Sequence, residues 1–281
     1  MKDYSRYRLT VRKSPHDARD FKFRAIYAPV ALPTKFSNRP YLLPARDQED
    51  TPECAAFAGS SSQQGRDTRE YGLDEYLSPQ FIYNHREDPQ EEGMYNRDLM
   101  KILQGKGVCI ERLYRFRSSD TPSQAAYENA LNHRSDNYAA IDYIEELKQA
   151  LYIKGPCIMA VPVYNYTERM WYQFPGEEFL GGHDMLVTGY DDEHRAFEVF
   201  NSWGLEFGDD GYIYMSYDDF SLAWEFWSNV DLPSRPTTTE APTTTSAPEP
   251  DKEPWINKYW WVLVIAVLAI GTFIGLISYI W

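Results

Sequence analysis

The stretch Arg46-Asp-Gln-Glu-Asp-Thr-Pro-Glu-Cys-Ala-Ala-Phe-Ala58 predicts a loop that leads into a helix, with Cys54 at the start of that helix. Pro52 fits the turn before a helix or its first position, and Thr51 or Asp50 can cap the free backbone donors. A cysteine near the positive end of a helix dipole is favoured as the thiolate, the form that attacks. Cys54 is therefore the candidate nucleophile, although a lone cysteine beside alanine and phenylalanine is more often an inert core residue.

Two further motifs follow in a fixed order. Gly181-Gly-His-Asp-Met-Leu-Val-Thr-Gly-Tyr190 supplies His183, and Asn201-Ser-Trp-Gly204 supplies Asn201. His183 lies 183 − 54 = 129 residues after Cys54, and Asn201 lies 201 − 54 = 147 residues after it. These separations are close to the roughly 130 to 150 residues typical of papain-type sites. On these motifs the chain resembles the papain-like cysteine proteases of the peptidase C1 family.

The resemblance implies a role for each of five residues. Cys54 would be the nucleophile, His183 the general base and acid, and Asn201 the residue that orients the imidazole. Gln48 precedes the cysteine by 54 − 48 = 6 positions and would donate to the oxyanion. Trp203 would shield the histidine and asparagine pair from water.

The resemblance spans about residues 14–231 and implies a papain-like α+β fold with two lobes, a helical lobe carrying the cysteine and an antiparallel β lobe carrying the histidine and asparagine. The hydrophobic pattern predicts helices that begin at Ser78-Pro79, cover 94–105 and resume from Ile141. It predicts antiparallel strands at 157–163, 185–190, 196–201 and 211–215. Residues 117–140 should be a surface insertion with at most one short helix and an exposed His133, and 220–230 should pack back over the core.

Composition excludes several classes of protein. Residues 1–232 carry 25 Lys and Arg against 38 Asp and Glu, a balance of 25 − 38 = −13, so nucleic-acid binding is not expected. Three cysteines cannot form a closed disulfide set, and Cys109 and Cys157 sit in apolar contexts that predict buried free thiols. This cysteine usage favours a lineage adapted to a reducing compartment. Five scattered histidines and no Cys-x-x-Cys predict no metal site, and no other cofactor is expected.

The first residues predict no targeting or inhibitory segment. Residues 1–24 are polar and basic, without the apolar run of a secretory signal. Only 53 residues precede Cys54, fewer than the long helical pro-segment that many members of the resembled family carry. We therefore expect no inhibitory propeptide and control of activity from elsewhere. Asn165-Tyr-Thr167 is a glycosylation acceptor by sequence, expected to stay unmodified without a signal peptide.

The carboxyl-terminal tail differs in composition from the peptidase domain, residues 1–232. Residues 233–254 are rich in threonine and proline and predict an extended linker. Residues 255–281 predict a transmembrane anchor, because 260–281 holds no charge and, as a helix about 33 Å long, matches a hydrocarbon layer of about 30 Å. Lysines precede this span and no charge follows it, which favours a tail anchor with a cytoplasmic catalytic domain. Such a protein would suit a large DNA virus, in a host or virion membrane.

Within the predicted span, Gly271-Thr-Phe-Ile-Gly275 is a weak signal for a homodimer.

Three residues depart from the resembled pattern and leave alternatives open. Glu53 stands where a small residue is usual and disfavours the thiolate unless its side chain points to water. Ala55 replaces the usual aromatic residue, and Asp184 replaces a small one, although on a strand it should point away from His183 and not interfere. The leading hypothesis is an active thiol endopeptidase acting on polypeptides. The alternatives are an inactive papain-fold binding or structural membrane protein and, as a minor one, a thiol-dependent transferase.

Overall fold

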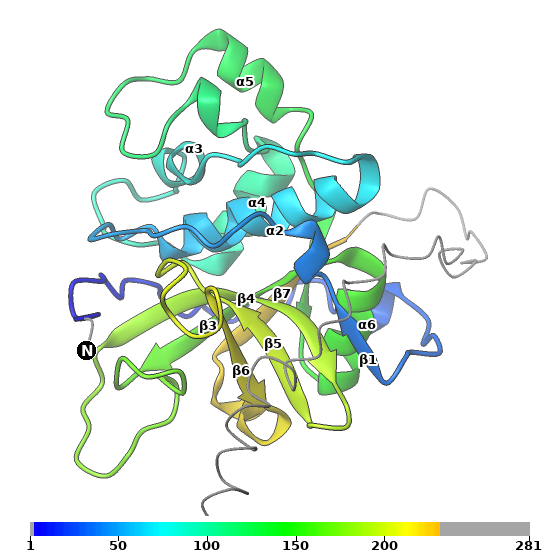
Figure 1. The fold of residues 1–281 in the computed structure, drawn as a ribbon. Helices are drawn as coiled ribbons and strands as arrows, with labels where there is room; N and C mark the ends of the chain where they lie inside the picture. Colours follow the sequence, from blue (N-terminus) through cyan, green and yellow to red (C-terminus); the bar gives the residue numbers. More distant parts are fainter. Residues whose placement is uncertain (1–2, 231–281) are drawn as a thin grey trace, which may run out of the picture. The chain divides into compact units, whose positions relative to one another are not determined.

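A long helix, α2 (Cys54–Tyr71), lies across one face of a twisted antiparallel sheet (Figure 1). The computed structural model describes residues 3–230. The predicted linker 233–254 and the predicted anchor 255–281 lie outside the described residues. Within residues 3–230, no helix combines the length and the apolar character needed to cross a membrane.

The sheet has seven strands in the described part of the chain, and its main path runs β2-β7-β3-β4-β5-β6, with β1 pairing the far half of β4. Every strand pair is antiparallel, as predicted. The strands are β1 (Lys35–Ser37), β2 (Asn137–Ile141), β3 (Cys157–Val163), β4 (Gly181–Asp191), β5 (Ala196–Phe200), β6 (Tyr212–Ser216) and β7 (Glu225–Val230).

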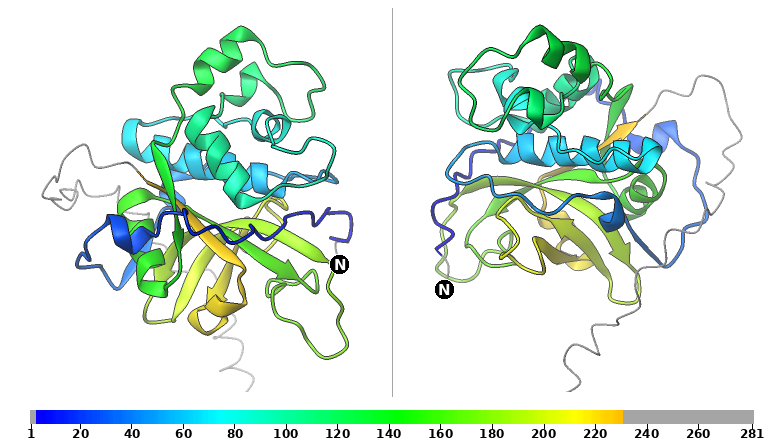
Figure 2. Two further views of the ribbon diagram at one scale, coloured as in Figure 1. Left: turned by 180° about the vertical axis from the view of Figure 1, so that it is seen from behind. Right: turned by 45° about the horizontal axis from the view of Figure 1, so that its top comes forward.

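The helices form two groups. Figures 1 and 2 show α3 and α5 on the side of α2 away from the sheet, and α6 with α1 beside the sheet, whereas α4 packs against α2 and also contacts β2 and β7. Their bounds are α1 (Phe23–Ile26), α3 (Pro79–Asn84), α4 (Asn96–Gly105), α5 (Gln124–Ala130) and α6 (Ile144–Lys154). Short 3-10 helices cover Arg39–Tyr41, Glu111–Leu113 and Tyr217–Leu222.

Side chains on the two faces of the sheet enter two separate apolar cores. Along β3, Ile158 and Ala160 join the core beneath α2, whereas Met159 and Val161 join the core on the opposite face. This alternation is the two-residue period of a strand buried on both faces. The sheet therefore has α2, with Cys54 as its first residue, on one face, and the core that contains Met159 and Val161 on the other face.

Local sequence signals identified some helix boundaries and missed others. Ser78 caps α3 as predicted, because its Oγ accepts the Phe81 amide at 3.0 Å. The predicted side-chain cap of α2 is wrong: no side chain caps this helix, and Thr51 Oγ1 instead donates to the Gln48 carbonyl at 2.7 Å. The loop before Cys54 is therefore stabilised by a hydrogen bond between two of its own residues.

Three strands were missed by the sequence analysis. Ile141, expected to begin a helix, ends β2, and α6 begins at Ile144. Residues 220–230 do not simply pack over the core, because β7 lies inside the sheet between β2 and β3. Both β2 and β7 mix polar with apolar residues, so the hydrophobic pattern of their sequences is weak. These two segments become strands because they pair with neighbouring strands of the sheet. The third, β1, has only three residues, too few for a pattern.

The prediction that His133 is solvent-exposed is also wrong. The insertion does contain one short helix, α5, but His133 is only 5% exposed. Its Nδ1 lies 2.7 Å from Asp67 Oδ2 and 3.0 Å from the Tyr71 hydroxyl, both on α2. The insertion is thus fastened to α2 by a buried polar contact.

Candidate active site

Cys54 is the first residue of α2 and is completely buried. Burial raises the pKa of its thiol to about 12, and the negative charge of Asp184 adds to this rise. Backbone hydrogen bonds from Asp184 and Thr10 oppose it. The expected preference for the thiolate is therefore not met in this state of the site, because desolvation outweighs the helix dipole.

His183 and Asn201 meet at one end of the sheet, as the sequence predicted. His183 is the third residue of β4, and Asn201 directly follows β5, which runs back along β4. His183 Nε2 lies 2.8 Å from Asn201 Oδ1, and both side chains are buried. His183 Nδ1 has no hydrogen-bond partner. Burial lowers the pKa of His183 to about 4, so the imidazole is neutral and one of its nitrogens is free to take a proton.

Gln48 is held against the segment that carries Asn201. Its backbone amide donates to the Ser202 carbonyl at 2.8 Å, and its Oε1 accepts from Ser202 Oγ at 2.7 Å. Its Nε2 donates to the Thr51 carbonyl at 3.1 Å, which uses one of the two amide hydrogens and leaves the second for another acceptor.

Trp203 packs beside the histidine at a ring-centroid distance of 4.9 Å and an interplanar angle of 34°. The tryptophan is 1% exposed. It therefore forms an apolar wall beside the His183 and Asn201 pair, in the position that the sequence analysis expected.

The two acidic residues that depart from the family pattern are both buried. Glu53 is only 4% exposed, and burial raises the pKa of its carboxyl to about 7, so it does not point to water. Asp184 alternates away from His183 along β4, as predicted. The expectation that it would not interfere is nevertheless wrong, because its negative charge raises the pKa of the Cys54 thiol.

The remaining cysteines take no part in the site. Cys109 and Cys157 are free and buried, as predicted. Within residues 3–230, no group of three or more His, Cys, Asp or Glu side chains is placed to hold a metal ion.

The sequence analysis missed a segment that lies beside Cys54, whose thiol receives a backbone hydrogen bond from Thr10. Residues 7–12, here called the strap, lie along the site; Figure 2 (left) shows the dark blue amino-terminal trace between the helices and the sheet. Val11 N donates to the Gly182 carbonyl at 3.1 Å, and Arg12 N donates to the Met94 carbonyl at 3.3 Å. Tyr7 stacks on Trp203 at a centroid distance of 4.8 Å. The strap therefore contacts β4 at Gly182 and the segment before α4 at Met94.

Glycines permit this close approach. A Cβ on Gly93 would lie 2.0 Å from the Thr10 carbonyl oxygen, and a Cβ on Gly182 would lie 2.3 Å from that of Val11. Any side chain at either position would push the strap away. The expectation that control of activity comes from elsewhere than a propeptide stays a prediction.

Comparison with known proteins agrees with the predicted papain-like fold. The family model for papain family cysteine proteases matches residues 32–224. An uncharacterised peptidase C1-like protein of Acanthamoeba polyphaga mimivirus is 28% identical over 74% of this chain and 78% of its own length. A cathepsin B-like protein of Giardia intestinalis is 28% identical over 68% of this chain and 71% of its own.

Among solved structures, xylellain, a cysteine protease from Xylella fastidiosa, superposes with a TM-score of 0.71 at 27% identity, over 82% of this chain and 99% of that chain. The cysteine at the start of α2, the order of the three motifs and the shared α+β architecture all agree with the family match. The chain belongs to the papain family of cysteine proteases.

Proposed function

We propose that the chain is a thiol endopeptidase that hydrolyses internal peptide bonds of polypeptides with Cys54, His183 and Asn201. One observation carries the proposal: His183 Nε2 is fixed by Asn201 at 2.8 Å, while its Nδ1 is left without a partner. A neutral imidazole held in this way can accept a thiol proton and later return it.

The chemistry follows from these positions. His183 takes the proton of Cys54, and the sulfur attacks the carbonyl carbon of the substrate. The Cys54 amide and the second Nε2 hydrogen of Gln48 donate to the oxyanion. His183 then protonates the leaving amine, the amine departs, and water hydrolyses the thioester to regenerate the thiol. Trp203 keeps water from the bond between His183 and Asn201.

The strap makes the described state a latent one. With Cys54 completely buried, a peptide must displace residues 7–12 before it reaches the sulfur. Removing the strap would also return solvent to the thiol, which lowers its pKa toward the range in which the helix start stabilises a thiolate.

The test uses the full chain with peptides blocked at both ends and an epoxide that alkylates papain-type thiolates. Alkylation at Cys54 together with cleavage of internal bonds is expected, and both should be absent from Cys54→Ala. Tyr7→Ala removes the stacking on Trp203 and should speed both reactions, with Tyr164→Ala as the control tyrosine outside the strap. Cleavage by purified Cys54→Ala would refute the mechanism.

A second candidate, an inactive binding protein on the papain fold, is favoured by the burial of Cys54 and the rise of its pKa to about 12. It predicts no alkylation of Cys54 and no peptide cleavage even in Tyr7→Ala. The same pair of measurements therefore separates a latent protease from an inactive one.

We further propose that residues 255–281 tether the protease to a membrane with its catalytic domain on the cytoplasmic side. Support comes from the sequence of the tail, with 22 uncharged residues at 260–281. A chain ending at Asp231 should stay in solution after centrifugation of vesicles and cleave free peptides as the full chain does. Trypsin added outside sealed microsomes should digest the catalytic domain of the full chain. Protection of the domain would reverse the orientation, and recovery of the full chain in the soluble fraction would remove the anchor.

A further inference from the structure

Two residues near the proposed oxyanion donor have unusual backbone conformations. Within residues 3–230, four residues other than glycine have a positive φ, and two of these lie in connections between paired strands. The other two are Glu49, with φ 55°, and Arg117, with φ 62°. A positive φ is costly for a residue with a Cβ and persists where the surroundings hold it. Glu49 directly follows Gln48, so a contact that holds Glu49 also acts on the oxyanion donor.

The side chain of Arg117 binds Glu49 and the residue after it. Arg117 Nη1 forms an ion pair with Glu49 Oε2, and Arg117 Nη2 donates to Asp50 Oδ1 at 2.8 Å. One guanidinium thus spans two neighbouring carboxylates, and its planar fork restricts the backbone between them more than a single ion pair would. The Glu49 amide also donates to Asp47 Oδ1 at 2.7 Å. The residue with the positive φ is therefore fixed both at its amide and at its side chain.

The backbone of Arg117 is itself fixed to α3. Its amide donates to Gln80 Oε1 at 2.7 Å, and Gln80 is the second residue of that helix. The Gln80 side chain also forms a hydrogen bond with the carboxyl group of Glu53, the residue before Cys54. Arg117 therefore acts on both ends of the loop 49–53, through its own side chain at one end and through Gln80 at the other.

The loop that Arg117 binds joins the two groups of the proposed oxyanion hole. Gln48 is held on the sheet side, because its amide and its Oε1 both bind Ser202. Cys54 lies on the helical side, as the first residue of α2. Between them, the amide and the hydroxyl of Thr51 both donate to the Gln48 carbonyl, at 3.3 and 2.7 Å. These internal bonds fix the shape of the turn at residues 48–51, whereas the contacts of Arg117 tie this turn to the helical side.

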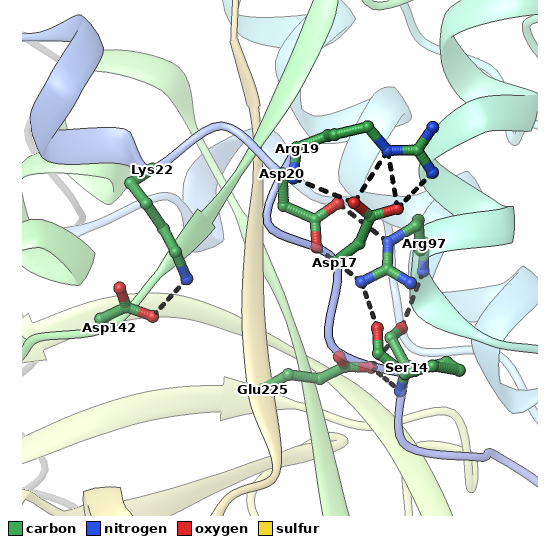
Figure 3. Close-up of polar contacts among 9 residues, drawn as sticks. Ser14, Asp17, Arg19, Asp20, Lys22, Arg97, Asp142 and Glu225 are labelled. Atoms are coloured by element: carbon green, nitrogen blue, oxygen red, sulfur yellow. Dashed lines mark hydrogen bonds and ion pairs between the residues drawn. The ribbon is translucent and has the colours of Figure 1, made fainter.

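A second arginine, Arg97 of α4, shows by contrast what an ion pair does away from this loop. Its guanidinium binds Asp20 through Nε at 2.9 Å and Nη2 at 2.5 Å, and its amide donates to Ser14 Oγ at 3.1 Å (Figure 3). These contacts fasten residues 14–20 to α4, and neither Arg97 nor Asp20 has a positive φ. Arg97 therefore joins two segments of ordinary conformation, whereas Arg117 holds a conformation that is costly without support.

We propose that Arg117 is a positioning residue for the oxyanion hole, because its guanidinium holds Glu49 at a positive φ. The neighbouring Gln48 is thereby set in place relative to the Cys54 amide. The inference rests on the proposed function, in which these two groups donate to the oxyanion. Such donors are effective when they are fixed before the charge develops. A looser loop would bind the substrate as before and would stabilise the transition state less.

The first test measures kcat and KM of the full chain on a peptide that is cleaved internally. Arg117→Ala keeps the Cβ and removes both ion pairs, so kcat should fall about fivefold while KM stays nearly unchanged. Arg117→Lys, which can pair with one carboxylate at a time, should recover part of the loss. Arg112→Ala is the matched control and should keep kcat, because Arg112 Nε binds Glu75 Oε2 at 2.8 Å in a likewise exposed ion pair. An unchanged kcat in Arg117→Ala would overturn the proposal.

A double-mutant cycle tests the positive φ of Glu49 directly. Glycine adopts a positive φ without the penalty of a Cβ, so a Glu49→Gly chain needs no ion pair to keep this conformation. Adding Arg117→Ala to it should lower kcat by about twofold or less. Arg195→Gly, which changes a positive φ in the turn between β4 and β5, is the control and should leave the full loss in place. An undiminished loss in the Glu49→Gly chain would refute the action of Arg117 through Glu49.

Amide hydrogen exchange of the full chain gives a measurement that needs no catalysis. Arg117→Ala should speed exchange at residues 48–51 by about fivefold, and Arg112→Ala should not. Equal exchange in Arg117→Ala and in the unaltered chain would overturn the positioning role. No cleavage of any peptide, by the full chain or by Tyr7→Ala, would overturn the proposed function, and the exchange rates would still decide whether Arg117 holds the loop.

Discussion

The chain buries two histidines whose surroundings differ in one decisive way. His183 is fixed through Nε2 by the neutral amide of Asn201, and its Nδ1 has no partner. His133 shares its Nδ1 between the carboxylate of Asp67 and the hydroxyl of Tyr71. A histidine that carries protons needs a ring nitrogen that is free to bind and release a proton. A ring nitrogen that is held by a buried carboxylate instead links the two parts of the structure that carry the histidine and the carboxylate. The hydrogen-bond partner, and not burial, distinguishes the proposed catalytic histidine from the other buried one.

The largest effect should separate the two histidines directly. His183→Ala should lower turnover by about 10⁴-fold or more, because nucleophile and base act as one unit. His133→Ala should keep the turnover of each folded molecule. The measurement is peptide hydrolysis normalised to folded protein by circular dichroism. An equal loss of turnover in folded His133→Ala would break the comparison.

Gln48 belongs to the catalytic side of the comparison. Gln48→Ala should lower kcat by roughly 10² to 10³ through loss of one oxyanion donor. Ser202→Ala removes only the hydroxyl that holds Gln48 Oε1 and should have a smaller effect. Pre-steady-state measurement of acylation is the readout, and an unchanged acylation rate in Gln48→Ala would place the oxyanion donor elsewhere.

His133 should show its effect in stability. His133→Ala leaves Asp67 in the interior without the imidazole that faces it, which costs about 3 kcal/mol of unfolding free energy. Tyr71→Phe deletes one hydroxyl and should cost about 1 kcal/mol. Urea unfolding monitored by tryptophan fluorescence measures both, and a loss below about 1 kcal/mol in His133→Ala would deny it a structural role.

An effect on stability smaller than that of His133→Ala should come from Glu53, which lies next to Cys54 in the sequence. Its pKa is about 7 in the folded chain against 4.5 for the ordinary group. The folded state therefore binds more protons between these values, and stability falls as pH rises from about 4.5 to 7. Glu53→Gln should stabilise the fold at pH 8 by about 2 kcal/mol, below the roughly 3 kcal/mol of the full shift. At pH 4 the two proteins should unfold alike, and a constant difference across pH would exclude titration of Glu53.

The sequence predicted the meeting of His183 and Asn201 better than it predicted the strap or the surroundings of His133, for a physical reason. Cys54, His183 and Asn201 stand in motifs of a fixed order, and the predicted meeting of the histidine with the asparagine is confirmed by their contact at 2.8 Å. The strap carries no such motif: its polar and apolar residues form backbone hydrogen bonds to Gly182 and Met94 that any sequence could make. His133 was misplaced because its partner Asp67 lies 66 residues away, beyond any local pattern.

In the proposed latent state, the strap belongs to the same chain as the site that it covers, so dilution cannot weaken its hold. A tethered segment acts at an effective concentration of the order of millimolar. A peptide must compete with it, and the apparent affinity falls in proportion to the fraction of molecules whose strap is open. The protease should therefore ignore dilute peptides and respond when polypeptide is crowded around it. The six residues of the strap would in this way set the polypeptide concentration above which substrate displaces the strap. Cys54 and His183 alone could not set such a concentration.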